Sequence, residues 1–468
     1  MHAEIPIGMI RLAVAASLLA CACSENGANS EVRSVVWIEV DTLRADALGC
    51  YGNESRGEGG ALPSPVIDGL AAEGVLFERA YSAAPWTVPS LVTQLTGLWP
   101  WQHGALRLLK PLTVKGANLP ESFRREGWRT AGVMTNFVAQ DQYHFDEGFE
   151  LWDQELAENG PEGSTGVAAA ERLLEITDYF LERPGEGLFL LLFLFEPHWR
   201  YEAQPGLSFG PESSGGLKLD GSMADLRKRR ADLTPLQIDY LRGTYQSEVA
   251  GVDRAIGVFF DGLRERGLDQ EALIVFTSDH GEELMERGWI GHTRTLHEEL
   301  VRVPLVMRLP ISMRANRTST RIPFAVSQID LGATILNLMG VEGSLGEGIS
   351  LASTVLDGVK PARRYLFLHT DFDPPLRTPE SLEKVAIQWG VVDAESNEKW
   401  IVDRHPDHEV EGKPPTQWFR LSDDPLEQND LSEEGAVPEG LFALPALNPE
   451  ISTELLNGAY PPNGAGDE

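Results

Sequence analysis

Cysteine, positive charge and long apolar stretches are all scarce in this 468-residue chain. Its three cysteines are Cys21, Cys23 and Cys50, and only one of them lies beyond the N-terminal segment, so no disulfide framework is expected. Lysine and arginine together number 39 against 71 aspartates and glutamates, which gives a formal net charge of −32. A surface with this charge disfavours nucleic acid and anionic lipid as partners. An anionic substrate would need a metal ion or local cations to overcome the same field.

The N-terminal segment is typical of a targeting signal. Its apolar run, residues 12–20, is too short to span a bilayer, and no later stretch is apolar enough to do so. The run ends in Leu18-Leu19-Ala20-Cys21, which resembles the lipobox of bacterial lipoproteins. We expect residues 1–23 to be a lipoprotein signal peptide, with Cys21 or Cys23 carrying the lipid, and residues 24–32 to be a tether. A plain secretory signal is the alternative. The prediction places the protein in a bacterial cell envelope, held by its lipid anchor alone and facing the periplasm or the exterior.

The rest of the sequence alternates between apolar runs of strand length and helical stretches. Ser34–Val40 is mostly apolar and suits a buried parallel strand. Ser64-Pro65 opens a helix with an N-cap residue and a proline in the first turn. The other expected strands are 130–134, 188–195, 272–277 and 303–307, and the other helices are 166–181, 235–266 and 329–339. This alternation predicts an α/β fold with a mostly parallel central sheet flanked by helices.

The pattern changes after about residue 361. Short strands are expected at 365–369, 386–391, 399–403 and 417–421. We therefore predict a large α/β domain over residues 33–360, a smaller C-terminal α+β domain with an antiparallel sheet over 361–456, and a flexible tail over 457–468.

Polar side chains stand where two of the apolar strands end. Asp41 follows the strand 34–40, and Asp279 and His280 come just after the strand 272–277. Open parallel sheets bind ligands at the carboxyl ends of their strands. Carboxylates with an imidazole make a mixed oxygen and nitrogen site for a divalent ion. Strand-end aspartates also cap helices, so a structural role remains the alternative at each position.

Several segments resemble, in the same order, the sulfatase branch of the alkaline phosphatase superfamily. They are Asp41-Thr42-Leu43-Arg44-Ala45-Asp46, the stretch from Ala84-Pro85-Trp86-Thr87 to Gly97, Gly127-Trp128-Arg129-Thr130, Glu196-Pro197-His198, Asp279-His280-Gly281-Glu282-Glu283, Gly291-His292 leading into Val301-Arg302-Val303-Pro304-Leu305, and a closing turn from Trp418 to Gln428. The resemblance covers roughly residues 33–432. It implies an alkaline-phosphatase-like α/β sandwich with a small C-terminal antiparallel sheet.

The resemblance implies that Asp41, Asp279 and His280 are metal ligands. It also implies that Thr87 is both a ligand and the nucleophile, since Thr87 stands where the family has the Cys or Ser that is oxidised to formylglycine. Threonine cannot be oxidised by that route, so no formylglycine is expected. The attacking group would be a plain hydroxyl activated by the metal. We expect one divalent ion, and Ca²⁺, Mn²⁺, Mg²⁺ and Zn²⁺ all remain open.

Four further positions match family positions around the ester. His198 and His292 match residues that contact the charged group or protonate the leaving group. Asn136 and Arg294 are expected to bind substrate. Asn136 stands where many sulfatases have a lysine, and Arg294 offers a charge that does not depend on pH. Residues 206–230, rich in glycine and serine and then basic, are interpreted as an excursion near the site.

The implied activity is metal-dependent hydrolysis of sulfate or phosphate esters on a small-molecule, glycan or lipid substrate. Thr87 in place of formylglycine favours phosphate esters over sulfate esters as substrates. One alternative is a cell-envelope transferase of phosphoryl groups, because transfer and hydrolysis share a covalent intermediate. The other is a non-catalytic binding protein on the same scaffold, since Leu91 replaces the arginine of the family pattern. Cys50 and His103 are expected to be structural.

Overall fold

The computed structural model describes residues 33–114, 116–158, 166–183, 185–314, 320–372, 386–404 and 416–432. The predicted signal peptide, tether and C-terminal tail lie outside these residues, as does the part of the C-terminal domain beyond residue 432. Those assignments stay predictions. Among the described residues, no helix is both long enough and apolar enough to cross a membrane.

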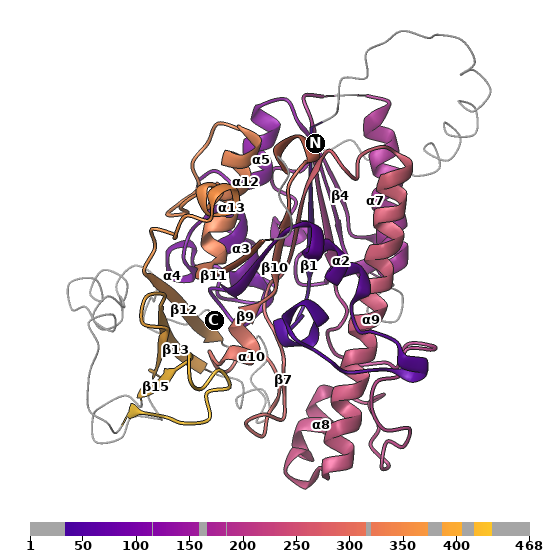
Figure 1. Cartoon of the computed structure of the whole chain (residues 1–468), viewed down its shortest axis with the longest axis vertical. Coiled ribbons are helices and arrows are strands. Elements are labelled where there is room, and N and C mark those ends of the chain that lie inside the picture. The colour runs from indigo at the N-terminus through magenta and orange to yellow at the C-terminus, as the bar shows by residue number, and fades with distance from the viewer. Residues whose placement is uncertain are drawn as a thin grey trace, which may run out of the picture.

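A sheet of nine strands, counted over the described residues, forms the centre of the molecule (Figure 1). Eight strands lie in the order β11-β2-β10-β6-β1-β5-β3-β4, and β9 pairs with β2. The run from β6 through β1, β5 and β3 to β4 is parallel, whereas β10 is antiparallel to both of its neighbours. The bounds are β1 Ser34–Val40, β2 Val75–Tyr81, β3 Arg129–Met134, β4 Leu151–Asp153, β5 Leu188–Leu194, β6 Ala272–Ser278, β9 Arg302–Val303, β10 Leu305–Arg308 and β11 Thr320–Ser327.

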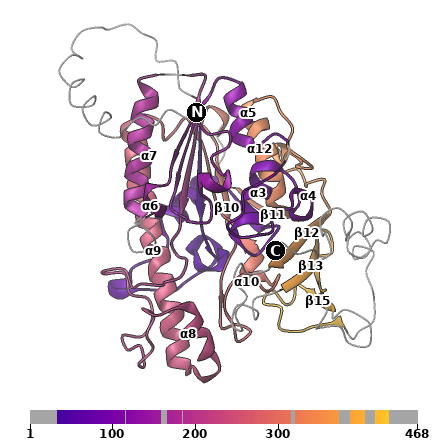
Figure 2. The ribbon, with the colours of Figure 1, turned by 180° about the vertical axis from the view of Figure 1, so that it is seen from behind.

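Helices cover both faces of this sheet, as Figures 1 and 2 show from opposite sides. One face carries α2 (Pro65–Glu73), α7 (Gly166–Leu181) and α9 (Pro235–Glu265), and the other carries α3 (Thr87–Thr96), α5 (Leu119–Arg125), α12 (Leu331–Met339) and α13 (Ala352–Asp357). Shorter helices are α4 (Pro100–His103), α6 (Glu155–Glu158), α8 (Met223–Lys228), α10 (Glu298–Val301) and α11 (Ile311–Arg314). Single turns of 3₁₀ helix are η1 (Ala45–Ala47), η2 (Gly49–Tyr51), η3 (Glu58–Gly60), η4 (Asp141–Tyr143), η5 (Arg230–Asp232) and η6 (Gln328–Asp330).

The strand β1 shows why these sequences form a doubly covered sheet. Val35 and Trp37 belong to the apolar cluster under α3 and α12, and Val36, Ile38 and Val40 belong to the cluster under α7 and α9. All five are fully buried. Since successive strand residues point to opposite faces, only a run that is apolar on both faces can occupy this position. Burying each such aliphatic side chain contributes about 1.5–3 kcal/mol.

The C-terminal strands form a second, antiparallel sheet in the order β12-β13-β14-β15. Their bounds are β12 Tyr365–Phe372, β13 Ala386–Asp393, β14 Glu398–Asp403 and β15 Thr416–Arg420. One face of the sheet packs against α10, and the other packs against Trp99 and Trp101. The backbone N–H of His369 also donates to the Ala83 carbonyl, just before α3. The predicted small antiparallel sheet is confirmed, and it lies directly against the segment that carries Thr87.

Two features of the main sheet were not predicted correctly. The single strand expected at 303–307 is divided at Pro304, which has no N–H for a sheet ladder, into β9 and β10. The strands β2, β11 and the three-residue β4 were not predicted at all. β2 contains the half-exposed pair Glu78 and Arg79, and β11 contains Pro323, so neither has a continuous apolar run.

Candidate functional site: a buried cation site beside Thr87

The ends of β1 and β6 bring the two aspartates together. In the parallel sheet Val40 pairs with Ser278 on one side and with Leu194 on the other. Asp41 and Asp279 are the next residues on their strands, so they leave the sheet side by side. Both are fully buried. A short two-stranded ribbon of β7 (Glu283–Leu284) and β8 (Ile290–Gly291) follows Asp279 in the chain.

Asp41, Asp279 and His280 converge on one point. One ligand atom from each lies within 4.8 Å of the other two. Nε2 of His280 lies 3.5 Å from Oδ1 of Asp41 and 3.4 Å from Oδ2 of Asp279. The sequence predicted these three residues as a group, and the structure brings them together.

The hydrogen bonds of these side chains leave three acceptor atoms facing one another. Nδ1 of His280 lies 2.8 Å from the Gly281 carbonyl, which can only accept, so the proton belongs on Nδ1 and Nε2 presents a lone pair. Oδ1 of Asp41 and Oδ2 of Asp279 are buried and have no hydrogen-bond partner among the residues that the structure describes. Their other oxygens accept from Asn136 and from backbone N–H groups. Three facing acceptors with no proton between them fit a divalent cation.

The pKa values of the two aspartates support the same interpretation. Burial raises the pKa of Asp41 well above its usual value, and the charges of Asp279 and Glu282 raise it further. Burial also raises the pKa of Asp279, while His280 and the Thr87 hydroxyl act in the opposite direction. A bound cation would remove this penalty by stabilising both carboxylates.

Thr87 is the first residue of α3 and follows the extended residue Trp86. Its side chain is buried, and its Oγ1 lies 3.4 Å from Nε2 of His280. The amides and dipole at a helix N-terminus stabilise negative charge by about 0.3–1 kcal/mol. That is far too little to ionise a threonine alone, so ionisation requires a cation in the neighbouring group of acceptors.

His198 and His292 lie beside His280. The ring centre of His292 is 4.5 Å from that of His280 and 5.1 Å from that of His198. Nδ1 of His198 lies 2.9 Å from the Trp199 carbonyl. Burial, helped by the neighbouring His292, lowers the pKa of His198 to about 3. His198 is therefore a neutral imidazole at neutral pH.

Glu282 and Tyr201 also belong to the site, and neither was predicted as a site residue. Oε1 of Glu282 lies 3.0 Å from Nδ1 of His292, and Oε2 accepts the Tyr201 hydroxyl at 2.8 Å. Glu282 is fully buried; burial raises its pKa, and His198, the Tyr201 hydrogen bond, His280 and Arg227 lower it. One feature of the sequence could have indicated Glu282 as a site residue, namely its position two residues after His280. No feature of the sequence indicated Tyr201, because only the folded chain brings its hydroxyl to Glu282.

Asn136 and Leu91, which stand where the family pattern has a lysine and an arginine, have different surroundings. Nδ2 of Asn136 donates to Oδ2 of Asp41 at 2.5 Å, and Oδ1 of Asn136 accepts the Val138 N–H. Leu91 is fully buried in the apolar cluster between α3 and the sheet. Asn136 thus contacts a candidate ligand directly, whereas Leu91 is part of the core.

The remaining predicted positions contact other side chains. The guanidinium of Arg294 lies 4.1 Å from the centre of the Trp289 ring. His103 is buried, 3.2 Å from the Thr93 hydroxyl, and burial lowers its pKa to about 3. Burial raises the pKa of the Cys50 thiol to about 12, which disfavours a reactive thiolate. The surroundings of His103 and Cys50 suit structural roles.

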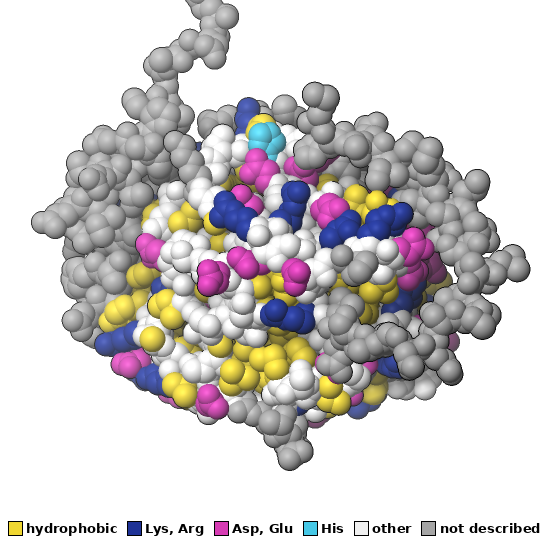
Figure 3. Space-filling view, turned by 90° about the horizontal axis from the view of Figure 1, so that it is seen from above, with side chains coloured by type: hydrophobic (Ala, Val, Ile, Leu, Met, Phe, Trp, Pro, Cys, Tyr) yellow, Lys and Arg dark blue, Asp and Glu magenta, His cyan; other side chains and the backbone are white. Residues whose placement is uncertain are grey.

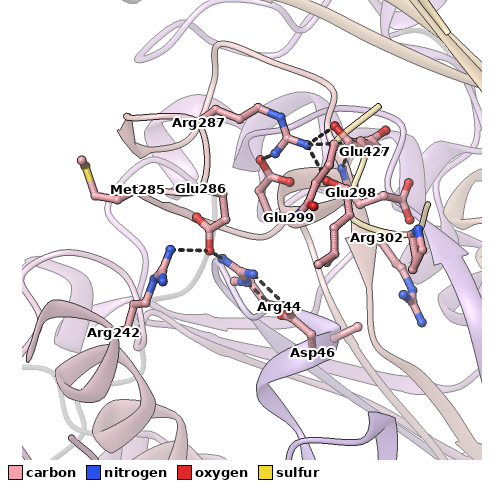
Figure 4. Close-up of a pocket in the computed structure, with 14 residues that line it drawn as sticks. Arg44, Asp46, Arg242, Met285, Glu286, Arg287, Glu298, Glu299, Arg302 and Glu427 are labelled. Carbon is pink, nitrogen blue, oxygen red and sulfur yellow. Dashed lines mark hydrogen bonds and ion pairs between the residues drawn. The ribbon is translucent and has the colours of Figure 1, made fainter. Parts of the chain in front are cut away.

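A cavity of about 920 Å³ is lined by Met285, Glu286 and Arg287, by α10 and by the closing turn (Figure 4). Figure 4 shows Arg287 pointing toward Glu299 and Glu427. Arg44 lies between Asp46 and Glu286, 2.7 Å from each. These cations are engaged by carboxylates of the chain itself. The cavity is therefore a salt-bridged junction between the closing turn and the main sheet.

The fold and the site define an α/β protein in which three side chains that could hold a metal ion lie beside a threonine hydroxyl. The chain belongs to the sulfatase family, whose model matches residues 33–341. Members of this family and its neighbours are hydrolases of sulfate and phosphonate esters, and the protein is an ester hydrolase of that family. The resemblance inferred from the sequence motifs is confirmed at the level of family and fold.

Similar proteins include the multifunctional alkaline phosphatase superfamily protein PehA of Trinickia caryophylli, 24% identical over 422 residues that cover 73% of this chain and 80% of that protein. The endo-4-O-sulfatase of Bacteroides thetaiotaomicron is 21% identical over 373 residues, which cover 68% and 71% of the two chains. The solved phosphonate monoester hydrolase of Agrobacterium radiobacter superposes with a TM-score of 0.65 at 19% identity, covering 91% of this chain and 95% of that one. A structure in complex with its substrate D-glucosamine-2-N,6-O-disulfate gives a TM-score of 0.68 at 18% identity, covering 91% and 99%. At these identities the two structures establish the shared fold.

Proposed function

We propose that the protein is a metal-dependent hydrolase of sulfate or phosphate-type esters in which Thr87 replaces formylglycine as the nucleophile. The observation that carries the proposal is the position of the Thr87 hydroxyl, 3.4 Å from Nε2 of His280 at the edge of three buried acceptors. The site lacks the family's oxidisable residue but keeps three candidate ligands, Asp41, Asp279 and His280, and these could still activate a hydroxyl for attack on an ester.

Asp41, Asp279 and His280 would hold one divalent cation, with Thr87 at its edge. The ion would supply the charge that lowers the pKa of the Thr87 hydroxyl and neutralises the ester oxygens. Thr87 at the helix N-terminus then presents its oxygen to the ester in a fixed direction. The Asn136 amide keeps Oδ2 of Asp41 occupied, which directs Oδ1 toward the other acceptors.

His292 is assigned the proton transfer to the leaving group. Its Nδ1 is held by the buried carboxylate of Glu282, so its Nε2 faces away from that carboxylate. His198 is neutral at neutral pH because burial lowers its pKa to about 3, so it can accept hydrogen bonds but has no proton to give on Nε2. The Thr87 oxygen, whose proton is released to solvent, attacks the phosphorus or sulfur atom and breaks the bond from that atom to the leaving oxygen, which takes a proton from His292. Water then attacks the Thr87 ester and gives a proton back to His292, which releases the phosphate or sulfate and restores the Thr87 oxygen.

The substrate class follows from Thr87 and from the similar proteins. A threonine alkoxide attacks phosphoryl groups in the same way as sulfuryl groups, and the relatives include a multifunctional superfamily member, an endo-4-O-sulfatase and a phosphonate monoester hydrolase. We therefore propose phosphate or phosphonate esters alongside sulfate esters, carried on a small molecule, glycan or lipid. The proposal also keeps the predicted lipid anchor at Cys21 or Cys23, with the site outside the cytoplasmic membrane of a bacterium.

The test is a panel of aryl sulfate, aryl phosphate and aryl phosphonate esters, each with Ca²⁺, Mn²⁺, Mg²⁺ and Zn²⁺. Thr87→Ala is compared with Thr96→Ala, a matched control on the same helix whose hydroxyl donates to the Val92 carbonyl and accepts the Leu98 N–H. We expect turnover that needs a divalent ion, is lost in Thr87→Ala and persists in Thr96→Ala. Full activity in Thr87→Ala would refute the nucleophile. Turnover only when an alcohol acceptor is present would identify the transferase instead.

A further inference from the structure

Three arginine side chains gather around one indole ring next to the candidate site. The guanidinium carbons of Arg227, Arg230 and Arg294 lie 5.0, 4.8 and 4.1 Å from the centre of the Trp289 ring. Arg227 belongs to α8 and Arg230 to η5. Both lie at the basic end of residues 206–230, the segment interpreted from the sequence as an excursion near the site. Arg294 comes from the segment after β8. The three cations therefore reach the same ring from two parts of the chain, and each is within cation–π distance of it.

This cluster lies against the backbone that presents His292. Arg227 is only 5% exposed, and its Nε donates to the Ile290 carbonyl at 2.7 Å. Gly291, the next residue, has a φ of 110°, and a β-carbon at that position would collide with Nη2 of Arg227. A glycine is thus required for the guanidinium to approach the chain directly before His292.

Two buried donors on the same segment lack an acceptor. The Trp289 Nε1–H and the Thr293 hydroxyl are buried and have no hydrogen-bond partner among the described residues. Thr293 directly follows His292 and has a φ of 88°, a conformation that is strained for a β-branched residue. Strain and unsatisfied donors at one place are typical of a site that a ligand completes. The missing partners are acceptors, which an anion supplies.

Three basic side chains meet at Trp289 in a protein whose formal net charge is −32. On the face shown in Figure 3 basic and acidic side chains are interspersed. Around Trp289, three permanently charged guanidiniums lie within 5.0 Å of one ring centre. Their planar N–H groups are donors of the kind that bind the oxygens of an anion.

We infer that Arg227, Arg230 and Arg294 form a subsite for a second anionic group of the substrate, a sulfate, phosphate or carboxylate near the ester that reacts. The inference rests on the proposed function for the position of that ester. It implies that the protein prefers doubly anionic substrates over singly anionic ones. A guanidinium is suited to this role because its planar fork matches the oxygens of such groups.

Binding to the Thr87→Ala protein tests the subsite without turnover. The probes are two matched pairs, a monosulfated and a disulfated hexosamine, and a monophosphorylated and a bisphosphorylated hexose, measured by calorimetry with the divalent ion present. The variants are Arg230→Gln and Arg294→Gln, which are partly exposed, and the more buried Arg227→Gln, with thermal unfolding to show that each folds. Arg229→Gln is the matched control, since Arg229 is exposed, adjacent in sequence and absent from the ring contacts.

We expect the doubly anionic member of at least one pair to bind about tenfold or more tightly than its singly anionic partner. Arg230→Gln and Arg294→Gln should each remove most of that preference, and Arg229→Gln should keep it. Equal affinity within both pairs, no binding of either doubly anionic probe, or a preference that survives both variants would overturn the subsite. A separate measurement tests the proposed function: it fails if the wild-type protein does not turn over aryl esters.

Discussion

Replacing Glu282 by glutamine should slow the reaction without unfolding the protein. The Glu282 carboxylate accepts the Tyr201 hydroxyl at 2.8 Å and holds Nδ1 of His292 at 3.0 Å. Glutamine has the same shape but one acceptor oxygen, so it can keep only one of these two bonds as an acceptor. If its amide nitrogen faces His292, then Nδ1 must become the acceptor, and the tautomer of the ring reverses.

The magnitude follows from the type of hydrogen bond that is lost. A hydrogen bond to a charged group contributes about 1.5–3 kcal/mol, which corresponds to a loss of roughly 10- to 100-fold in kcat. Glu282 is fully buried and its pKa is raised by burial, so the uncharged glutamine should leave thermal stability nearly unchanged. The loss should be larger for phenyl esters than for 4-nitrophenyl esters, because a poor leaving group depends more on proton donation.

The assay is kcat and KM for both leaving groups in wild type and Glu282→Gln. Glu283→Gln is the control, because Glu283 is also buried but accepts the backbone N–H groups of Arg287 and Trp289. We expect the control to keep normal kcat for both esters. The assignment of His292 as proton donor would be refuted if Glu282→Gln lost the same factor with both leaving groups, or lost nothing.

Three further predictions concern stability and the metal. Burial, with the charge of Glu299, raises the pKa of Glu283 to about 7 from 4.5. The folded protein therefore loses stability as pH rises through that range, and Glu283→Gln should be more stable than wild type by up to about 3 kcal/mol near pH 8 in urea unfolding, with the difference closing below about pH 4.5. Lys399 is fully buried between Glu427 Oε1 at 2.8 Å and Glu298 Oε1 at 3.0 Å. Lys399→Met should cost about 3–5 kcal/mol, because it removes the buried cation that both carboxylates share; a loss under 1 kcal/mol in urea unfolding would contradict this. Chelation of the divalent ion should abolish ester turnover. Adding back the correct ion at about 100 times its Kd should restore turnover and raise the free energy of unfolding by about 2.7 kcal/mol. Turnover in the chelated protein would contradict the cation site.

The sequence predicts those helices and strands whose own residues carry a clear apolar run or periodicity. The apolar run of β1 and the helix α7 have the bounds that the sequence pattern predicts, because each carries its own periodicity. The strands β2 and β11 lack a continuous apolar run and become strands through their neighbours in the sheet, so their local sequence did not reveal them.

The same distinction holds within the site. Asp41 and Asp279 could be placed because each directly follows a recognisable strand of a parallel sheet. Tyr201 and Trp289 could not, because they reach the site through contacts with residues distant in the sequence or with the insertion around α8. The hydrogen bond from Asn136 to Asp41 shows the same limit, since it is visible only in three dimensions, while the role of Asn136 in substrate binding stays a prediction.

The most direct test of the central claim is to trap the covalent intermediate. The wild-type protein, loaded with the divalent ion, is mixed with a reactive aryl phosphate or aryl sulfate and quenched in acid, and the peptide containing Thr87 is examined by mass spectrometry. The account predicts that this peptide gains one phosphoryl or sulfuryl group on Thr87, and that the gain disappears on chelation and in Thr87→Ala. An unmodified Thr87 peptide in an enzyme that turns over, together with full activity of Thr87→Ala, would contradict it.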